Sequence, residues 1–388
     1  MADIGAFHYT GFAQEVILGP GALARLGAAV ERFSWRRLLL CATGSAQRRG
    51  WVAQIESELG ERLIATFARV QPHVQDFQVA EALALAVEAE VDAVIGLGGG
   101  SPIGLAKAVG SALEEKRVGR PARAAFPTDQ PLVPVVAIPT TYAGSEMTPV
   151  YGITHRQADG STRKVTVNDP KLAPKLVIYD PSLTLDLPPE MTASTGINAL
   201  AHCVEAAYSI TRHPLSTAAA VDGARHIVRA LPRCYSVGDD LAARAEMLMG
   251  AHLAGFALSS VAMGVHHGLC HVLGGSAGVP HGVANAIMLP HVMRFNADAT
   301  GTELAPVAEA MGIGLSGLSA AAAVEAAAQK VYDLVGALNL PQRLSDAGVN
   351  ETDLPGLAGL AFQNRTVRNN PKPIVDAAQI EGVLRAAW

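Results

Sequence analysis

The sequence has few cysteines, no long apolar run and no concentrated basic charge, and each absence excludes a class of protein. Cys41, Cys203, Cys234 and Cys270 are scattered without CxxC spacing. This favours free thiols in a reducing cytoplasm over a disulfide or zinc framework. No segment of about 18 uninterrupted apolar residues occurs, so no membrane span is predicted. The net charge is -5 with no long basic run, so nucleic-acid binding is not indicated.

The N-terminal stretch MADIGAFHYTGFAQEVILGPGAL lacks a cationic start followed by an apolar core. We therefore expect no secretory signal and a cytoplasmic protein. Hydrophobic residues make up 49% of the chain and charged residues 17%, which is typical of a well-buried globular protein. The 388 residues exceed the usual size of one hydrophobic core, so two domains are expected.

The first half alternates strand-like and helix-like segments. Between the apolar runs lie stretches such as 76–90, whose apolar residues recur at helical spacing. This alternation predicts an α/β domain over residues 1–185, with a parallel sheet covered by helices. After residue 186 the pattern is Ala-rich and helical, which predicts an all-α domain over 186–388. The strands are expected at 37–43, 63–70, 91–100, 134–141 and 175–183.

The segment VIGLGGGSPIGLAKAV (94–109) predicts a phosphate-binding loop. Gly98, Gly99 and Gly100 follow an apolar strand and allow a sharp turn with close approach to a ligand. Ser101 is expected to cap the next helix, whose N-terminus offers unpaired N–H groups to a pyrophosphate. The alternative is a tight strand-to-helix turn without a ligand, because Ser101 stands in place of the third glycine of G-x-G-x-x-G.

A second polar loop, IPTTYAGSEMTP (138–149), follows the next strand. Its hydroxyls are expected at the same carboxyl edge of the sheet, where ligands of such sheets bind. The alternative is that they only cap the next segment. The predicted cofactor-binding residues are Gly98, Gly99, Gly100, Ser101, Thr140, Thr141, Tyr142, Ser145 and Lys164.

Histidines concentrate in the second half, where five of the twelve fall within residues 266–291. His267 and His271 are four apart on a predicted helix, a glycine pair is expected to end that helix, and His281 opens the next one. Upstream, GINALAHCVE places Asn198 and His202 on one helix face. That spacing suits two metal ligands, but a neutral amide is a poor ligand for a transition metal.

Together these motifs resemble the iron-containing alcohol dehydrogenase superfamily over nearly the whole chain. The resemblance implies a Rossmann-like N-terminal domain that binds NAD(P), a helical C-terminal domain and a site in the cleft between them. The family's metal ligands, an Asp followed by three His, fall on Asn198, His202, His267 and His281. His271 matches a further active-site histidine near the nicotinamide.

Within that superfamily the chain is most similar to the maleylacetate reductases. The similarity lies in TTYAGSEMTP, in TGINALAH, and in Gly104, where the alcohol dehydrogenases carry Asp. It implies metal-independent reduction of the conjugated double bond of maleylacetate to 3-oxoadipate in aromatic compound degradation, by a homodimer. Two alternatives stay open: a metal-dependent alcohol dehydrogenase in which Asn198 ligates weakly, and an inactive nucleotide-binding protein.

For this reaction we expect a partly cationic pocket that holds a dicarboxylate, with His267 or His271 as proton donor. Arg365 and Arg368, in a Pro/Asn-rich loop that also contains Lys372, are predicted to bind substrate carboxylates; the alternative is a solvated basic turn. The predicted catalytic residues are Asn198, His202, His267, His271 and His281.

NADH is the expected cofactor, with NADPH open, and no metal is expected. The segment after the strand 37–43 has no Asp or Glu to bind a ribose 2′-hydroxyl. Gln47, Arg48 and Arg49 follow it and would tolerate a 2′-phosphate.

Overall fold

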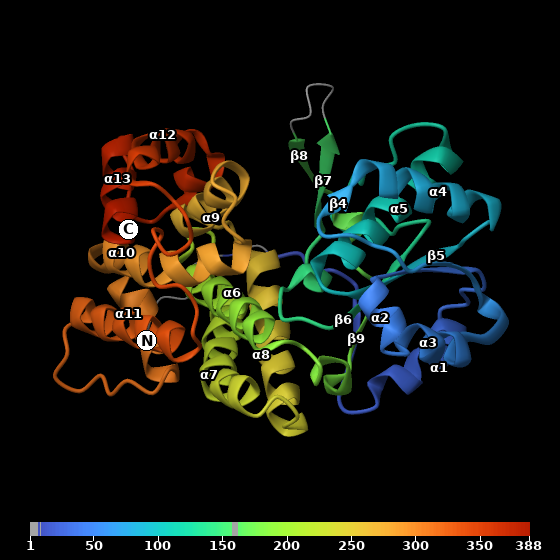
Figure 1. The fold of residues 1–388 in the computed structure, drawn as a ribbon, viewed down its shortest axis with the longest axis horizontal. Coiled ribbons are helices and arrows are strands. Elements are labelled where there is room, and N and C mark those ends of the chain that lie inside the picture. The colour runs from blue at the N-terminus through green and yellow to red at the C-terminus, as the bar shows by residue number, and fades with distance from the viewer. Residues whose placement is uncertain (1–6, 8, 157–161) are drawn as a thin grey trace. The chain divides into compact units, whose positions relative to one another are not determined.

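The computed structural model describes residues 7, 9–156 and 162–388 (Figure 1). The chain divides into two compact units. One unit is Thr10–Asp186, and the other joins Met1–Tyr9 to Leu187–Trp388. The described residues Phe7 and Tyr9 thus belong to the helical unit, which nothing in the sequence indicated. In that unit the ring centroid of Tyr9 lies 4.8 Å from that of His213, whose side chain caps helix α7 (Pro214–Ser236).

The α/β unit is built on a six-stranded parallel sheet of order β1-β9-β6-β5-β2-β3. The five strands predicted from the sequence are confirmed, and the short edge strand β1 was missed. Its half-buried sequence EVIL is too brief for a periodicity to stand out. The strands are β1 (Glu15–Leu18), β2 (Leu38–Ala42), β3 (Leu63–Phe67), β5 (Ala93–Gly98), β6 (Val135–Pro139) and β9 (Leu176–Tyr179).

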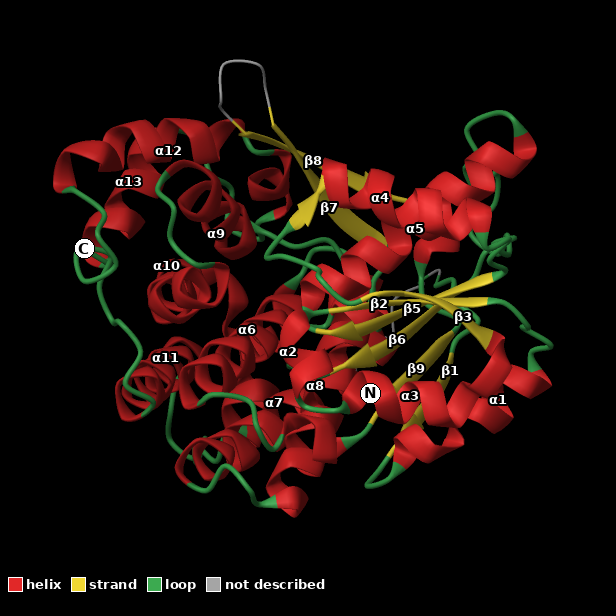
Figure 2. Cartoon of the chain, turned by 45° about the vertical axis from the view of Figure 1, so that its right-hand side comes forward, coloured by secondary structure: helices red, strands yellow, loops and turns green. Residues whose placement is uncertain are grey.

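Helices cover both faces of this sheet (Figure 2). Leu38 and Leu40 of β2 pack with helices α1 and α3 on one face, while Leu39 and Cys41 pack with α4 and α5 on the other. Because successive strand residues point to opposite faces, burial on both sides makes the run LLLCA apolar throughout. The helices of this unit are α1 (Leu26–Arg32), α2 (Gly44–Arg48), α3 (Trp51–Leu59), α4 (Asp76–Glu88) and α5 (Gly100–Val118).

A second, three-stranded sheet of order β4-β7-β8 was not predicted. It consists of β4 (Val74–Gln75), β7 (Val150–Arg156) and β8 (Thr162–Asn168). β4 pairs with β7 in parallel and β7 pairs with β8 antiparallel. The segment was missed because its strands are rich in Thr, Arg and Lys, and their partly exposed residues show no apolar run.

The second unit is all-helical over its described residues, as predicted. Helix α6 packs against α7, α8 and α10, while α9 packs against α10, α12 and the short helix η7. The glycine pair at 274–275 does not end α9, because α9 continues to Ser276; that prediction was wrong. The helices are α6 (Pro189–Tyr208), α7 (Pro214–Ser236), α8 (Leu241–Ser260), α9 (Val265–Ser276), α10 (His281–Ala310), α11 (Ala320–Ala337), α12 (Leu354–Gln363), η7 (Arg365–Asn369) and α13 (Ala377–Ala386).

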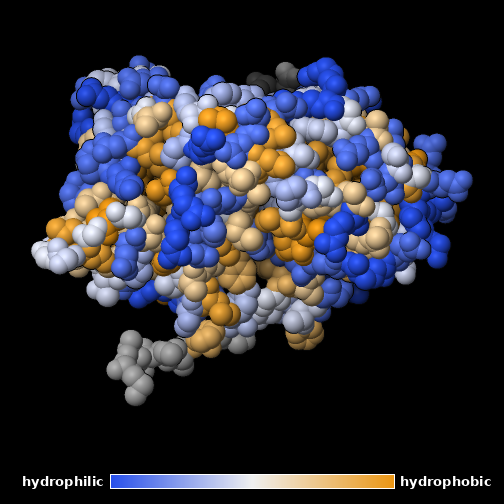
Figure 3. Space-filling view, turned by 90° about the horizontal axis from the view of Figure 1, so that it is seen from below, coloured by the Kyte–Doolittle hydropathy of each residue, from blue (hydrophilic) through white to orange (hydrophobic). Residues whose placement is uncertain are grey.

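Among the described residues no single helix is long and apolar enough to cross a membrane. The pair α8 and α9, bent by 100° at its break, meets that criterion of length and composition only when its two helices are joined. On the face shown in Figure 3, apolar side chains lie in several separate groups that hydrophilic side chains border.

Candidate active site

The glycine loop joins β5 to α5 in a conformation that needs glycine. Gly98 has φ +135°, and a Cβ atom there would lie 2.7 Å from Cγ of Pro102. At Gly96 a Cβ would lie 2.7 Å from Cα of Ile103, so the helix starts directly against the strand. Larger residues at these two positions would push α5 away from the sheet edge. The predicted phosphate-loop geometry therefore requires glycine at both positions.

Ser101 does not cap α5, contrary to the prediction. The N-cap residue is Gly99, which makes no side-chain cap, and the hydroxyl of Ser101 instead accepts a hydrogen bond from the amide of His73 at 3.0 Å. The first-turn amides of α5 are therefore not satisfied by a side-chain cap. They remain suited to an anion such as a pyrophosphate.

The structure brings the two predicted cofactor loops together. The amide of Thr140 donates to the carbonyl oxygen of Gly98 at 3.0 Å. A Cβ at Gly99 would lie 3.2 Å from Cγ2 of Thr141. Tyr142 is fully buried and Ser145 begins a short helix, η3 (Ser145–Met147). The loops after β5 and β6 thus form one continuous edge.

Lys107 of α5 holds the second loop in place, and the sequence did not single it out. Its buried ammonium group donates to the carbonyl oxygens of Ser145 at 2.6 Å, Thr148 at 2.8 Å and Val150 at 3.0 Å. Burial lowers the pKa of Lys107 to about 7, although the negative charge of Glu146 acts to raise it. A polar residue in the run IGLAKAV was the available signal, because a lysine on a buried helix needs partners.

Gly104, which the sequence marks as a difference from the alcohol dehydrogenases, is a packing position. A Cβ there would lie 2.8 Å from Cγ2 of Val74, in β4 of the small sheet. The absent side chain allows that sheet to lie directly on α5. Lys164 lies on β8, and its side chain is outside the described part of the structure.

Helix α6 presents Asn198, His202 and Glu205 on one face, because residues three, four and seven apart coincide there. All three are buried, and Glu205 is fully so. The sequence analysis named the first two and missed Glu205, although it ends the segment GINALAHCVE. A carboxylate on the face of two candidate ligands was the signal that could have identified it.

The four predicted histidines come together in the helical unit. The rings of His202 and His267 stack with centroids 4.9 Å apart, and those of His271 and His281 stack at 5.9 Å. The ring centroid of His267 lies 6.3 Å from that of His271 and 6.2 Å from that of His281. His202 and His267 are buried, whereas His271 and His281 are exposed. The cluster therefore consists of two buried imidazole rings and two that are accessible to solvent.

Glu205 joins α6 to the first turn of α9. Its Oε1 atom accepts hydrogen bonds from the amides of Gly264 at 2.8 Å and His266 at 3.1 Å. Its Oε2 atom accepts from the amide of His267 at 3.3 Å and from Nδ1 of the same residue. A carboxylate at a helix N-terminus is favourable because it meets both unpaired amides and the positive end of the dipole.

Burial holds two histidines of this region, His202 and His266, in their neutral form. Burial, followed by the charges of neighbouring histidines, lowers the pKa of His202 well below its ordinary value. Burial also lowers the pKa of His266 to about 4. Burial alone would raise the pKa of Glu205, but His267, His266 and the Gly264 amide bring it below its ordinary value. Any cationic character of the expected pocket therefore does not come from His202.

The donor set does not fit the iron or zinc site that the family name implies. Nδ1 of His202 and Nε2 of His267 are buried without a hydrogen-bond partner among the described residues and would suit a metal. The fourth position, however, is the neutral amide of Asn198. Glu205 is the nearby carboxylate: with His266 and His267 it forms a group of ligand atoms within 4.8 Å of one another. Its oxygens already accept from α9, so it cannot replace the missing acid.

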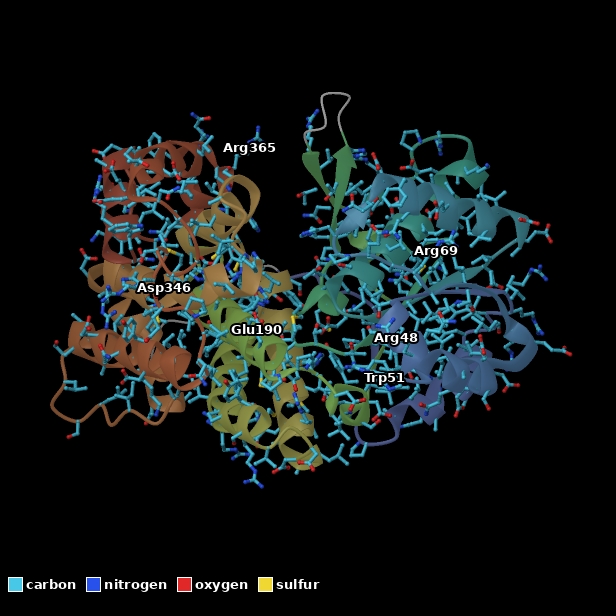
Figure 4. The ribbon with its side chains drawn as sticks, viewed as in Figure 1. Arg48, Trp51, Arg69, Glu190, Asp346 and Arg365 are labelled. Carbon is cyan, nitrogen blue, oxygen red and sulfur yellow. The ribbon has the colours of Figure 1, made fainter. Side chains whose placement is uncertain are left out.

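The predicted substrate arginines lie on η7, which packs against α9. Val367 fills the space beside Gly268, where a Cβ would lie 2.6 Å from Cγ2 of the valine. Arg365 and Arg368 are exposed and form no ion pair within the described residues, and Figure 4 shows Arg365 at the surface of the helical unit. Lys372 differs, because it pairs with Asp298 at 3.0 Å.

Comparison with known proteins gives consistent matches over both units. Residues 13–181 match the family described as iron-containing alcohol dehydrogenase, and residues 192–388 match its C-terminal region. A maleylacetate reductase of Pseudomonas knackmussii is 36% identical over 96% of this chain and 95% of its own.

Solved structures give the same picture. The maleylacetate reductase of Agrobacterium tumefaciens is 32% identical with a TM-score of 0.84, over 99% of this chain and 98% of its own. A 1,3-propanediol oxidoreductase, also 32% identical, superposes with a TM-score of 0.89 over 99% of this chain and 100% of its own.

Proposed function

Because the chain belongs to the iron-containing alcohol dehydrogenase family and, within it, to the branch of the maleylacetate reductases, we propose that it reduces maleylacetate, or a close 2-ene-4-oxo dicarboxylate, to 3-oxoadipate. The electrons come from NADH, and the α/β unit holds the cofactor on the loops after β5 and β6. We propose that the reaction proceeds without a metal, in a cytoplasmic homodimer.

The reaction consists of one hydride transfer and one proton transfer. Hydride from C4 of the nicotinamide adds to the alkene carbon remote from the ketone, and the electrons of the double bond move onto the ketone oxygen as an enolate. A proton then adds to the carbon beside the ketone, which gives 3-oxoadipate and NAD⁺. An alcohol dehydrogenase uses a Lewis acid for its alkoxide, whereas hydrogen-bond donors are sufficient for an enolate.

The observation that supports this function best is the composition of the histidine cluster. Four imidazoles lie together, the residue at the position of the family's acidic ligand is the neutral Asn198, and the nearby carboxylate of Glu205 is already committed to α9. Such a set offers nitrogen atoms to a polar, anionic substrate. The neutral Asn198 adds no negative charge, and the charge of Glu205 is balanced by hydrogen bonds from α9. His267 and His271 are the proposed proton donors or enolate stabilisers, and Arg365 and Arg368 are proposed to attract the substrate carboxylates.

A substrate panel tests the proposal. Purified protein is assayed for NADH oxidation with maleylacetate and with short aldehydes, and the product is identified by mass spectrometry. Formation of 3-oxoadipate with no aldehyde turnover is the expected result. Metal-stimulated turnover of aldehydes or alcohols would favour the alcohol dehydrogenase, and NADH binding without any turnover would favour an inactive nucleotide-binding protein.

A further inference from the structure

Glu205 is a buried charged group that the proposed reaction does not use. It has no exposed surface and lies on α6, one turn after His202. Hydrogen bonds from the amides of Gly264, His266 and His267 at the start of α9 and from one imidazole nitrogen occupy its two oxygens. A buried carboxylate is costly unless its hydrogen bonds are complete, and here they are supplied by the helix that carries the catalytic histidines.

The contact with His267 determines which ring nitrogen carries hydrogen. An ionised carboxylate only accepts hydrogen bonds, so Nδ1 of His267 must donate to Oε2 of Glu205. The other nitrogen, Nε2, is buried and has no hydrogen-bond partner among the described residues. The tautomer of a histidine is set by the hydrogen bond that its second nitrogen makes.

We infer that Glu205 is a positioning residue that keeps the hydrogen of neutral His267 on Nδ1, so that Nε2 is the atom that takes up a proton from solvent and delivers it to the substrate. The inference rests on the proposed function only for the identity of the substrate. The same carboxylate holds the first turn of α9, so ring orientation and helix position are controlled together. No covalent step is assigned to Glu205, which touches neither substrate nor cofactor.

The variant Glu205→Gln separates positioning from structural support. The glutamine oxygen can still accept the amides of Gly264 and His266, but its NH₂ group would face Nδ1 of His267 and donate to it. We expect a folded protein in which His267 carries its hydrogen on Nε2 and cannot take up a second proton, because Nδ1 faces an NH₂ donor. The loss in kcat is expected to be about 10²–10⁴-fold, the size found for misplaced acid–base groups and wrong tautomers. KM for NADH should stay unchanged.

Gly264→Ala is the matched control. Its Cβ would lie 3.1 Å from Oε1 of Glu205 and 3.1 Å from Oδ1 of Asn370, so it disturbs the same support without removing the carboxylate. We expect it to keep the wild-type tautomer, whatever its effect on stability. If Glu205 only supports α9, the two variants should lose activity in parallel with their melting temperatures.

The readout is ¹⁵N NMR of histidine-labelled protein, with the His267 signals assigned by their loss in His267→Asn. The inference predicts a protonated Nδ1 in the wild type and a protonated Nε2 in Glu205→Gln. An unchanged tautomer in Glu205→Gln, or unchanged kcat with the tautomer inverted, would overturn it. Because the spectra need no substrate, they decide the tautomer even if the wild type fails to reduce maleylacetate, which is a failure of the proposed function alone.

Discussion

The ring of His202, from α6, stacks on that of His267, from α9, with centroids 4.9 Å apart and planes 20° apart. Within the part of the chain that the structure describes, Nδ1 of His202 is buried without a hydrogen-bond partner, and the low pKa of His202 keeps the ring neutral. An unsatisfied buried nitrogen costs stability, so its retention beside the proposed substrate site is more readily explained by function than by packing.

Replacing His202 by Phe should therefore move stability and activity in opposite directions. The variant keeps an aromatic ring against His267 and removes the unsatisfied nitrogen, so the free energy of unfolding should be unchanged or higher by about 1–3 kcal/mol. Activity with maleylacetate should fall at least tenfold. Urea unfolding and steady-state kinetics measure the two effects, and a parallel loss of both would show that His202 is a packing residue.

The glycine loop offers a pair of neighbouring positions with different constraints. Gly98→Ala should destabilise the α/β unit, because Gly98 has φ +135° and its Cβ would meet Pro102. At Gly100 nothing lies within 4 Å of an added Cβ, so Gly100→Ala should leave the melting temperature unchanged.

If a dinucleotide lies against this loop, Gly100→Ala should still weaken NADH binding, by about tenfold or more, since a methyl group would occupy space close to the pyrophosphate. Calorimetric titration with NADH gives the comparison. Unchanged affinity in Gly100→Ala would argue that the cofactor does not approach the backbone at this point.

Much of this fold follows from local pattern. Strands buried on both faces, such as β2, give uninterrupted apolar runs, and long amphipathic helices give clear periodicity. The small sheet was missed because its half-exposed strands mix Thr, Arg and Lys. In addition, the pairing of β4 with β7 joins segments that are distant in sequence. Gly104 shows the same limit: its role becomes visible only once Val74 is placed beside it.

The site was predicted as a set of residues and not as a network. Spacing on one helix identified Asn198 and His202, and clustering identified the later histidines. Glu205 and Lys107 were missed because their roles lie in the backbone groups that they bind, at the start of α9 and in the loop after β6. Which backbone groups a buried charge will meet is decided by tertiary packing, which a single sequence does not reveal.

The stability of the helical unit should fall as the solution becomes acidic. Burial, and to a smaller extent Arg294, lowers the pKa of His291 to about 4 from its ordinary value of 6.5. Between these values the unfolded chain binds a proton that the folded chain does not, so stability present above pH 6.5 is lost as pH falls. The slope from this residue is at most about 1.4 kcal/mol per pH unit, and less because the ring is partly exposed.

The variant His291→Phe tests this effect away from the site, since it keeps a ring near Tyr332, 6.5 Å from His291. Urea unfolding from about pH 7 to about pH 5 should show a shallower pH dependence in the variant than in the wild type. His266, whose pKa is also lowered to about 4, should leave a residual slope. An identical pH dependence in both proteins would contradict the assignment to His291.

The most direct test of the proposed function is the reduction of maleylacetate by metal-depleted protein. The purified chain is dialysed against a strong chelator, its iron and zinc contents are measured by mass spectrometry, and NADH oxidation is followed with maleylacetate before and after the treatment. We predict full activity and 3-oxoadipate as product at a metal content far below one atom per chain. Activity that is lost on depletion and restored by stoichiometric iron or zinc would contradict the account, and would mean that Asn198 and the three histidines hold a metal after all.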